Sequence, residues 1–293
     1  MQSSQATSAA VRRAFSETSD PGRHVPRPGT ESRLDALWRW CQSEGIGSTV
    51  AAIVAPPGIG KTHLLRVFES RRLREDMARD SGVAAANGLS RSARSVLYLP
   101  YAALSLPDLC QWVHGLLGLP RPRAAAASDA DDDAMAALLA LGGGASRPFV
   151  LLIDDADSMP SATLRALVHG LARECSPLRI VIALSDDSRA TRMLAGLDSL
   201  RPLELPFREP LDEAETEAYL RARLTRTGLC PEVLDGLDRA TVTRIRALSG
   251  GIPRRIHRVV MALLEPERAA LARALAMTSR TDAWLGQPID DSF

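Results

Sequence analysis

Residues 48–63 read Ser-Thr-Val-Ala-Ala-Ile-Val-Ala-Pro-Pro-Gly-Ile-Gly-Lys-Thr-His, which is the most informative segment of the sequence. The apolar run over 50–54 predicts a buried strand, and the Pro/Gly segment behind it predicts a tight loop. Amphipathic spacing from Lys61 onward predicts a helix. A strand, a glycine-rich loop and a helix in this order are typical of a phosphate-binding loop. The start of such a helix offers unpaired backbone N–H groups and a positive dipole end to an anion.

The residue types in this loop suit phosphate chemistry. Gly58 and Gly60 allow the backbone to curl until its amides converge on a β-phosphate. The Lys61 ammonium can reach the β- and γ-phosphate oxygens, and the Thr62 hydroxyl can ligate Mg²⁺. Ala55 replaces the first glycine of the pattern G-x-x-x-x-G-K-[ST], at a position that turns the chain and tolerates a small residue. An ordinary Pro/Gly turn is the alternative. We expect a nucleotide to be held by Pro57, Gly58, Ile59, Gly60, Lys61, Thr62 and His63.

A second informative stretch, 149–157, reads Phe-Val-Leu-Leu-Ile-Asp-Asp-Ala-Asp. Five consecutive apolar residues predict a strand buried on both faces, as in a parallel sheet covered by helices. Acids at its carboxyl end lie on the edge where open α/β sheets bind ligands. We expect Asp154 to hold Mg²⁺, largely through water, and Asp155 to orient or deprotonate an attacking water. The pattern is weak alone but strong beside a phosphate-binding loop.

A third strand is predicted over 179–185 and ends at Ser185. Its hydroxyl could position a water beside a γ-phosphate. Alternatively, Ser185, Asp186 or Ser188 is simply the N-cap of the next helix. Strands that alternate with helices predict an α/β fold with a doubly wound parallel sheet.

The helices beside the phosphate-binding loop carry two further expectations. In the helix predicted over 30–41, Trp38 and Trp40 either stack on a base or, more simply, pack in the core. The helix after the loop buries Leu64, Leu65 and Phe68, and its charged residues Arg66, Arg71, Arg72 and Arg74 are expected to face outward.

From Pro210 the pattern is purely helical and predicts a C-terminal lid. Asp212 and Glu215 have the spacing of a capping box. Gly250 and Gly251 break the chain, and a buried helix follows, from whose start Arg254 could reach a phosphate. The domains expected are a flexible tail (1–28), a nucleotide-binding domain (29–208) with a surface insertion at about 120–133, a helical lid (209–278) and a C-terminal tail (279–293).

Composition limits the other possibilities. Of 293 residues, 45% are hydrophobic and 24% charged, which is ordinary for a soluble globular protein. Four widely spaced cysteines suggest neither a zinc site nor a disulfide framework. No run is long enough to span a membrane, and the N-terminus lacks an apolar signal core. A cytoplasmic protein fits best.

The net charge of +1 means that any nucleic-acid binding must come from a local patch. Residues 239–258 supply one candidate, because they contain six arginines and no acid: Arg239, Arg244, Arg246, Arg254, Arg255 and Arg258. These arginines either form a solvated face or meet acids of a neighbouring subunit, or they bind DNA phosphates without sequence preference.

The order APPGIGKT, VLLIDDAD, IVIALSDD and then a helical region carrying SGGIPRRIHR resembles the AAA+ ATPases. Residues 211–224 before GGIPRRI most resemble the bacterial ATPases related to the ExeA secretion-pathway protein and the transposition helpers. The resemblance covers about residues 26–264 and implies ATP and Mg²⁺ as cofactors. It implies these roles: Lys61 and Thr62 as Walker A, Asp154 and Asp155 as Walker B, Ser185 as sensor 1, Arg254 as sensor 2, and Arg201, with Arg192 as its competitor, as the finger for a neighbouring subunit.

Two departures from that family change the expected function. The family usually has Glu where this chain has Asp155, and a shorter carboxylate implies slow hydrolysis. The membrane span and cell-wall-binding region of secretion-pathway relatives are absent, which removes the support for an envelope role. We expect an ATP-hydrolysing switch that forms a homo-oligomer with nucleotide and acts on a partner, either DNA or a protein. The alternative is a nucleotide-binding scaffold with little or no turnover. A small-molecule P-loop kinase would not explain the lid or the sensor strand.

Overall fold

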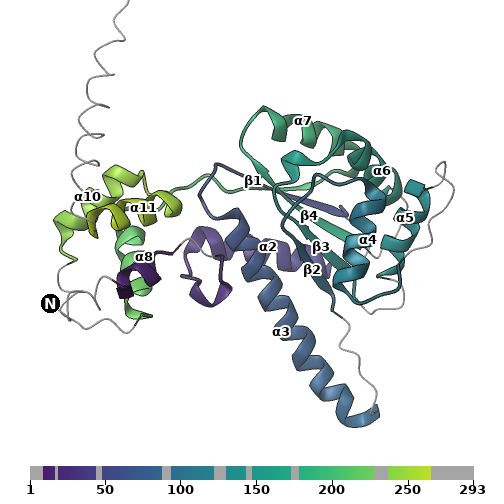
Figure 1. The fold of residues 1–293 in the computed structure, drawn as a ribbon, viewed down its shortest axis with the longest axis horizontal. Helices are drawn as coiled ribbons and strands as arrows, with labels where there is room; N and C mark the ends of the chain where they lie inside the picture. The colour runs from purple at the N-terminus through teal and green to yellow at the C-terminus, as the bar shows by residue number, and fades with distance from the viewer. Residues whose placement is uncertain are drawn as a thin grey trace, which may run out of the picture. The chain divides into compact units, whose positions relative to one another are not determined.

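The computed structural model describes residues 9–16, 19–43, 48–87, 94–121, 130–142, 147–172, 178–227 and 237–264. The chain divides into two compact units (Figure 1). One unit comprises Ser19–Glu209. The other combines Met1–Thr18 with Pro210–Phe293. The division between Glu209 and Pro210 lies one residue from the boundary expected from the sequence.

The larger unit is built on a five-stranded parallel sheet in the order β2-β3-β4-β1-β5. Its strands are β1 (Val50–Ala55), β2 (Val96–Leu99), β3 (Phe149–Ile153), β4 (Leu178–Ser185) and β5 (Leu203–Pro206). Every residue of β1, β2 and β3 is buried, which is the reason for their continuous apolar sequences. Ala55 lies opposite Ser185, and Ile153 opposite Ile182, so β1, β3 and β4 end at one edge. The predicted doubly wound parallel sheet is confirmed.

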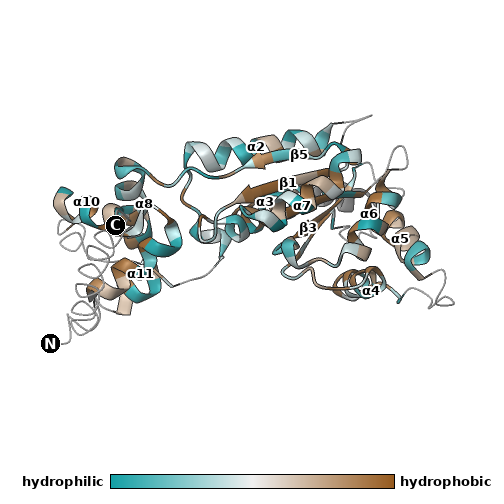
Figure 2. Cartoon of the chain, turned by 90° about the horizontal axis from the view of Figure 1, so that it is seen from above, coloured by the Kyte–Doolittle hydropathy of each residue, from teal (hydrophilic) through white to brown (hydrophobic). Residues whose placement is uncertain are grey.

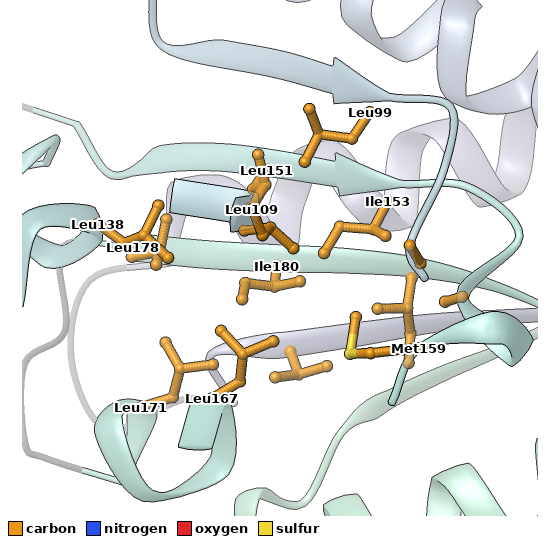
Figure 3. Packing of buried hydrophobic residues seen from close by; sticks show 14 of the residues in the cluster. Leu99, Leu109, Leu138, Leu151, Ile153, Met159, Leu167, Leu171, Leu178 and Ile180 are labelled. Atoms are coloured by element: carbon orange, nitrogen blue, oxygen red, sulfur yellow. The ribbon is translucent and has the colours of Figure 1, made fainter. Parts of the chain in front are cut away.

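Helices cover both faces of this sheet. Four of them pack on one face: α4 (Leu106–Leu116), α5 (Ala130–Ala140), α6 (Ser161–Leu171) and α7 (Ser188–Leu197). Figure 3 shows this core, where Leu151 and Ile180 of the strands meet Leu109 of α4 and Leu167 of α6. Hydropathy follows the layers, with apolar strands and mixed helices (Figure 2).

The other face is covered by α2 (Pro28–Gln42) and α3 (Lys61–Asn87). Tyr98 of β2 points to this side, where the guanidinium of Arg66 lies 3.8 Å from its ring centroid. The prediction that Arg72 faces outward is wrong, because this side chain is fully buried. Its Nε donates to the Ser95 hydroxyl at 2.9 Å, and its guanidinium lies 5.8 Å from the Trp38 ring centroid. A helical pattern with several arginines does not show which of them is buried and hydrogen-bonded in the interior.

The second unit is helical and contains α8 (Glu213–Thr225), α10 (Arg239–Ser249) and α11 (Pro253–Leu264). Asp212 and Glu215 form the predicted capping box at the start of α8. Gly250 and Gly251 adopt positive φ angles of 61° and 71° between α10 and α11. The sequence pattern therefore places the start of α8 correctly, and α11 follows the two glycines as expected.

The expected flexible tail (1–28) differs from the structure in its described parts. Residues 9–14 are helical, and Val11, Ala14 and Phe15 are buried in the core of the helical unit. Their spacing of three and four residues forms an apolar stripe, which the surrounding Ser, Thr and Arg residues obscure in the sequence. The short 3-10 helix η1 (Pro21–Arg23) follows in the larger unit.

Several expected features lie outside the described residues: most of the insertion (122–129), the end of the lid and the C-terminal tail (265–293). Residues 130–133 of that insertion are the first turn of α5. Of the helices in the described ranges, none combines the length and the hydrophobicity that crossing a bilayer requires.

Candidate nucleotide site

The phosphate-binding loop joins β1 to α3. Gly58 and Gly60 adopt positive φ angles of 84° and 116°, which residues with a side chain rarely accept. Lys61 is the first residue of α3 and is only 9% exposed. Its Nζ donates to the carbonyl oxygen of Ala55 at 2.8 Å, so the ammonium is folded back over the loop.

The charge of Lys61 is balanced by nearby acids. Burial lowers the pKa of Lys61, because it disfavours the ammonium. Four carboxylates oppose that shift, in decreasing order Asp157, Asp154, Asp155 and Asp186. A buried cation at the start of a helix, surrounded by acids, is arranged to receive an anion together with a counter-cation.

Asp154 joins three elements. The Thr62 hydroxyl of α3 donates to Asp154 Oδ2 at 2.6 Å, and the Tyr98 hydroxyl of β2 donates to the same oxygen at 2.8 Å. Asp154 itself follows β3 and is 3% exposed. Burial and the charge of Asp154 raise the pKa of Tyr98, so its hydroxyl remains a donor. Sequence reasoning missed Tyr98, although a tyrosine in a fully buried strand needs a partner for its hydroxyl.

The residues at this position fit Mg²⁺. Thr62 and Asp154 present a hydroxyl and a carboxylate oxygen within hydrogen-bond distance, and Mg²⁺ prefers oxygen ligands. Across the described ranges, His, Cys, Asp and Glu form no group of three or more that could hold a metal ion. The remaining ligands would therefore be nucleotide oxygens and water, as is usual for Mg²⁺ at phosphates.

Asp155 has an unusual backbone. Its φ and ψ are 45° and 41°, in the left-handed region that Asp tolerates better than most residues. Burial and the neighbouring charge of Asp154 raise the pKa of Asp155. Asp155 directly follows Asp154, which fits Mg²⁺.

Ser185 is the last residue of β4, and its backbone N–H donates to Asp157 Oδ2 at 2.8 Å. The N-cap of α7 is Asp187, whose Oδ1 accepts from the N–H groups of Arg189 and Ala190. The capping role considered for Ser185, Asp186 and Ser188 is therefore wrong. Asp187, two residues after Ser185, was the better candidate for the N-cap, because it directly precedes the first helical residue.

The imidazole of His63 lies beside the segment that precedes α2. Its Nε2 is 3.2 Å from Nδ1 of His24, and Nε2 of His24 is 2.7 Å from Glu31 Oε1. Arg71 pairs with the same carboxylate at 2.8 Å. Sequence reasoning did not connect His24 with the loop, since 39 residues separate it from His63.

The tryptophans of α2 are engaged in packing. Trp40 Nε1 donates to the Ser48 carbonyl oxygen at 2.9 Å. The Trp38 ring meets Phe68 edge-on, with centroids 6.0 Å apart. These contacts favour core packing over stacking on a base.

The structure thus brings Lys61, Thr62, Asp154 and Ser185 to one edge of the sheet, as predicted. Arg201 is exposed with a left-handed φ of 46°, and Arg192 is exposed on α7. Arg254 is exposed in the first turn of α11, in the other unit. The roles of these three arginines stay predictions.

Similar folds occur in solved structures. Cdc6p from Pyrobaculum aerophilum matches with a TM-score of 0.58 and 17% identity over 90% of this chain and 66% of that one. The Aeropyrum pernix ORC1 protein in complex with DNA matches with a TM-score of 0.55 and 16% identity, over 91% and 69%. Drosophila ORC bound to DNA matches with a TM-score of 0.55 and 16% identity, over 91% and 62%. This chain therefore spans less than two thirds of the length of the first and third of these proteins.

A search among curated proteins finds no match. A family described as "AAA ATPase domain" matches residues 29–182, from the start of α2 into β4. The match contains the phosphate-binding loop, Tyr98 and both acids that follow β3. Because it covers more than half of the 293 residues, the chain belongs to the family of AAA ATPase domains.

Proposed function

We propose that this protein is an ATP-hydrolysing switch with low turnover. The observation that carries the proposal is the hydrogen bond between Thr62 and Asp154, which joins the phosphate-binding loop to the acidic end of β3. Lys61, folded over the same loop, supplies the cation for the phosphates. Mg²⁺, when bound at Thr62 and Asp154, would neutralise charge that develops on the phosphates.

Hydrolysis needs a group that orients the attacking water, and Asp155 has that role in the proposal. Its side chain is one methylene shorter than the usual Glu, and its left-handed backbone restricts where the carboxylate can reach. A water that is held less well reacts more slowly, so we infer slow turnover. Ser185, Arg201 and Arg254 would complete the site as sensor 1, finger and sensor 2.

A switch needs a partner, and we propose nucleotide-dependent self-assembly on DNA. Two of the similar structures are of proteins bound to DNA, and this likeness supports DNA as the proposed partner. The helical unit adds exposed cations on α10 and α11, among them Arg244 and Arg255. Cations of this kind bind phosphate backbones with a strong dependence on salt. A protein partner is the other candidate, and the narrower resemblance to ExeA-related ATPases stays a prediction, as does the cytoplasmic location.

The test is steady-state ATP turnover of the full chain with and without duplex DNA at low salt. The proposed function predicts Mg²⁺-dependent phosphate release above that of Lys61→Ala. Binding of Mg·ATP without turnover would instead support a nucleotide-binding scaffold.

The DNA partner is tested by the double variant Arg244→Glu/Arg255→Glu, with Arg189→Glu on α7 as a control for charge reversal outside this surface. Loss of ATP-dependent DNA binding in the double variant alone supports the DNA surface. Loss of oligomers with DNA binding retained would assign these arginines to a subunit interface. If the wild type binds no DNA at low salt with ATP present, the DNA proposal is wrong.

A further inference from the structure

Asp157 is an acid next to the phosphate-binding loop that the proposed function leaves without a role. It lies in the short helix η2 (Ala156–Ser158), which follows β3. One carboxylate oxygen, Oδ2, accepts the backbone N–H of Ser185 at 2.8 Å. The other, Oδ1, is buried and has no hydrogen-bond partner among the described residues. Buried carboxylate oxygens are rarely left without a hydrogen-bond donor. We therefore expect the donor to Oδ1 to arrive with the ligand.

Asp157 lies close to residues that we expect to bind the phosphates. Ser185 precedes Asp186, whose N–H donates to the Ala55 carbonyl oxygen at 3.1 Å. The same carbonyl oxygen accepts from Lys61 Nζ. A chain of contacts therefore leads from Asp157 through the end of β4 to the phosphate-binding lysine. Of the four acids that oppose the lowered pKa of Lys61, Asp157 has the largest effect.

Asp155 alone would orient the attacking water poorly. The attacking water has two hydrogens and needs an acceptor for each if its lone pair is to face phosphorus. Asp155 can accept one of them, but its short side chain leaves from a left-handed backbone. Asp157 lies two residues further along the chain, and its carboxylate is held by the backbone N–H of Ser185.

We propose that Asp157 Oδ1 accepts the second hydrogen of the attacking water, so that Asp155 and Asp157 orient it together. This inference rests on the proposed function and adds a catalytic residue to it. In the step, the water oxygen forms a bond to the γ-phosphorus, and the bond to the bridging oxygen of ADP breaks with its electron pair. The water proton passes to a carboxylate and then to the released phosphate.

Asp157→Asn separates this role from the structural one. The amide oxygen of Asn can still accept the Ser185 N–H, so the end of β4 stays fixed. The amide nitrogen then replaces the buried Oδ1 and offers a donor where the water needs an acceptor. We expect kcat to fall about 10²-fold, within the range for lost general-base contacts, and the thermal midpoint and the Kd for Mg·ATP to stay close to wild type. Asp132→Asn, an exposed position in α5, is the control for the same change of charge.

Two further variants sharpen the result. Asp157→Ala also removes the bond to Ser185 and should lower the thermal midpoint as well as kcat. In Asp155→Asn/Asp157→Asn the losses should fail to multiply, because both acids act on one water.

The outcomes are distinguishable. An unchanged kcat in Asp157→Asn, with a wild type that hydrolyses ATP, overturns this inference and leaves the proposed function intact. A weaker Kd with unchanged kcat also overturns it, because Asp157 would then act on nucleotide binding through Lys61. A wild type that binds Mg·ATP without turnover contradicts both the inference and the proposed hydrolysis.

Discussion

The hydroxyl of Thr62 donates a 2.6 Å hydrogen bond to Oδ2 of Asp154, across 92 residues of sequence. The bond connects the first turn of α3 with the residue that follows β3. It depends on the parallel order of the sheet, in which β4 lies between β1 and β3 and all three strands end at the same edge. Tyr98 reaches the same carboxylate oxygen from β2. The candidate nucleotide site is therefore assembled from separate elements, and each prediction below tests one part of that assembly or of its support.

Lys61→Ala is expected to weaken ATP binding by at least about tenfold. The loss of a single hydrogen bond from a charged group to phosphate is worth about 1.5–3 kcal/mol. The fold should persist, because the variant removes a buried cation whose pKa burial already lowers. Equilibrium titration with a fluorescent ATP analogue measures the Kd, and thermal unfolding checks the fold. Binding as tight as in the wild type would contradict the candidate site.

Lys61 also permits a chemical test, because it is the only lysine in the sequence. Acylation by an amine reagent can therefore occur only at Lys61 and at the N-terminus. We expect Mg·ATP to slow modification of Lys61 and to leave that of the N-terminus unchanged, as measured by peptide mass spectrometry. Equal protection of both amines would point to a global change instead.

Asp155→Asn is expected to retain Mg·ATP and to hydrolyse it at least about tenfold more slowly, since a general base contributes about 10²–10⁴ in rate. Asn tolerates the left-handed backbone of this position at least as well as Asp, so the change is chemical rather than conformational. Single-turnover phosphate release measures the chemical step. An unchanged rate would assign Asp155 a structural role.

Gly251→Ala should destabilise the helical unit more than Gly250→Ala does. Both glycines have positive φ angles, and a residue with a Cβ there costs about 1–2 kcal/mol. At Gly251 a Cβ would also clash with the carbonyl oxygen of Leu211, whereas at Gly250 the nearest atom is Nη1 of Arg255, at 3.9 Å. Thermal unfolding and limited proteolysis of the two variants compare the effects. Equal losses would show that the close approach of Leu211 is relieved at little cost.

Arg147→Gln should lower stability at pH 7 and flatten its dependence on pH in acid. A hydrogen bond from Arg147 lowers the pKa of Glu75 below its ordinary value of 4.5, and the two side chains are 2.8 Å apart. A lowered pKa means that this contribution is fully present above pH 4.5 and is lost as the pH falls below it. We expect a loss of about 1–2 kcal/mol at pH 7 that shrinks toward pH 3, measured by urea unfolding.

Arg79→Gln is the matched control for Arg147→Gln. Arg79 pairs with the same Glu75 oxygen at 3.1 Å, but its side chain is 51% exposed. An exposed pair one helical turn apart is worth only a few tenths of a kcal/mol. Equal pH profiles for the two variants would contradict the assignment of the pKa shift to Arg147.

The parts of this protein that depend on local pattern can be predicted from its amino-acid sequence. The apolar runs of 50–54 and 149–153 predict strands buried on both faces, and Gly58 to Thr62 has the backbone freedom and charge that phosphates need. The strands of the parallel sheet and the capping box at Asp212 follow from such short-range rules. The contact between Thr62 and Asp154 also requires the parallel order of the strands, because 92 residues separate the two.

Which distant residues support these parts depends on how the strands and helices pack. Tyr98 lies 56 residues from Asp154, and Asp157 lies 28 residues from Ser185, so no local spacing connects either pair. Phe15 joins the helical core from the opposite end of the chain, and Arg72 is buried while Arg74, two residues later, is exposed. The sequence and its helical period show where apolar and charged side chains lie along a helix. Which buried donor meets which acceptor depends on how strands and helices pack, and only the folded chain contains that information.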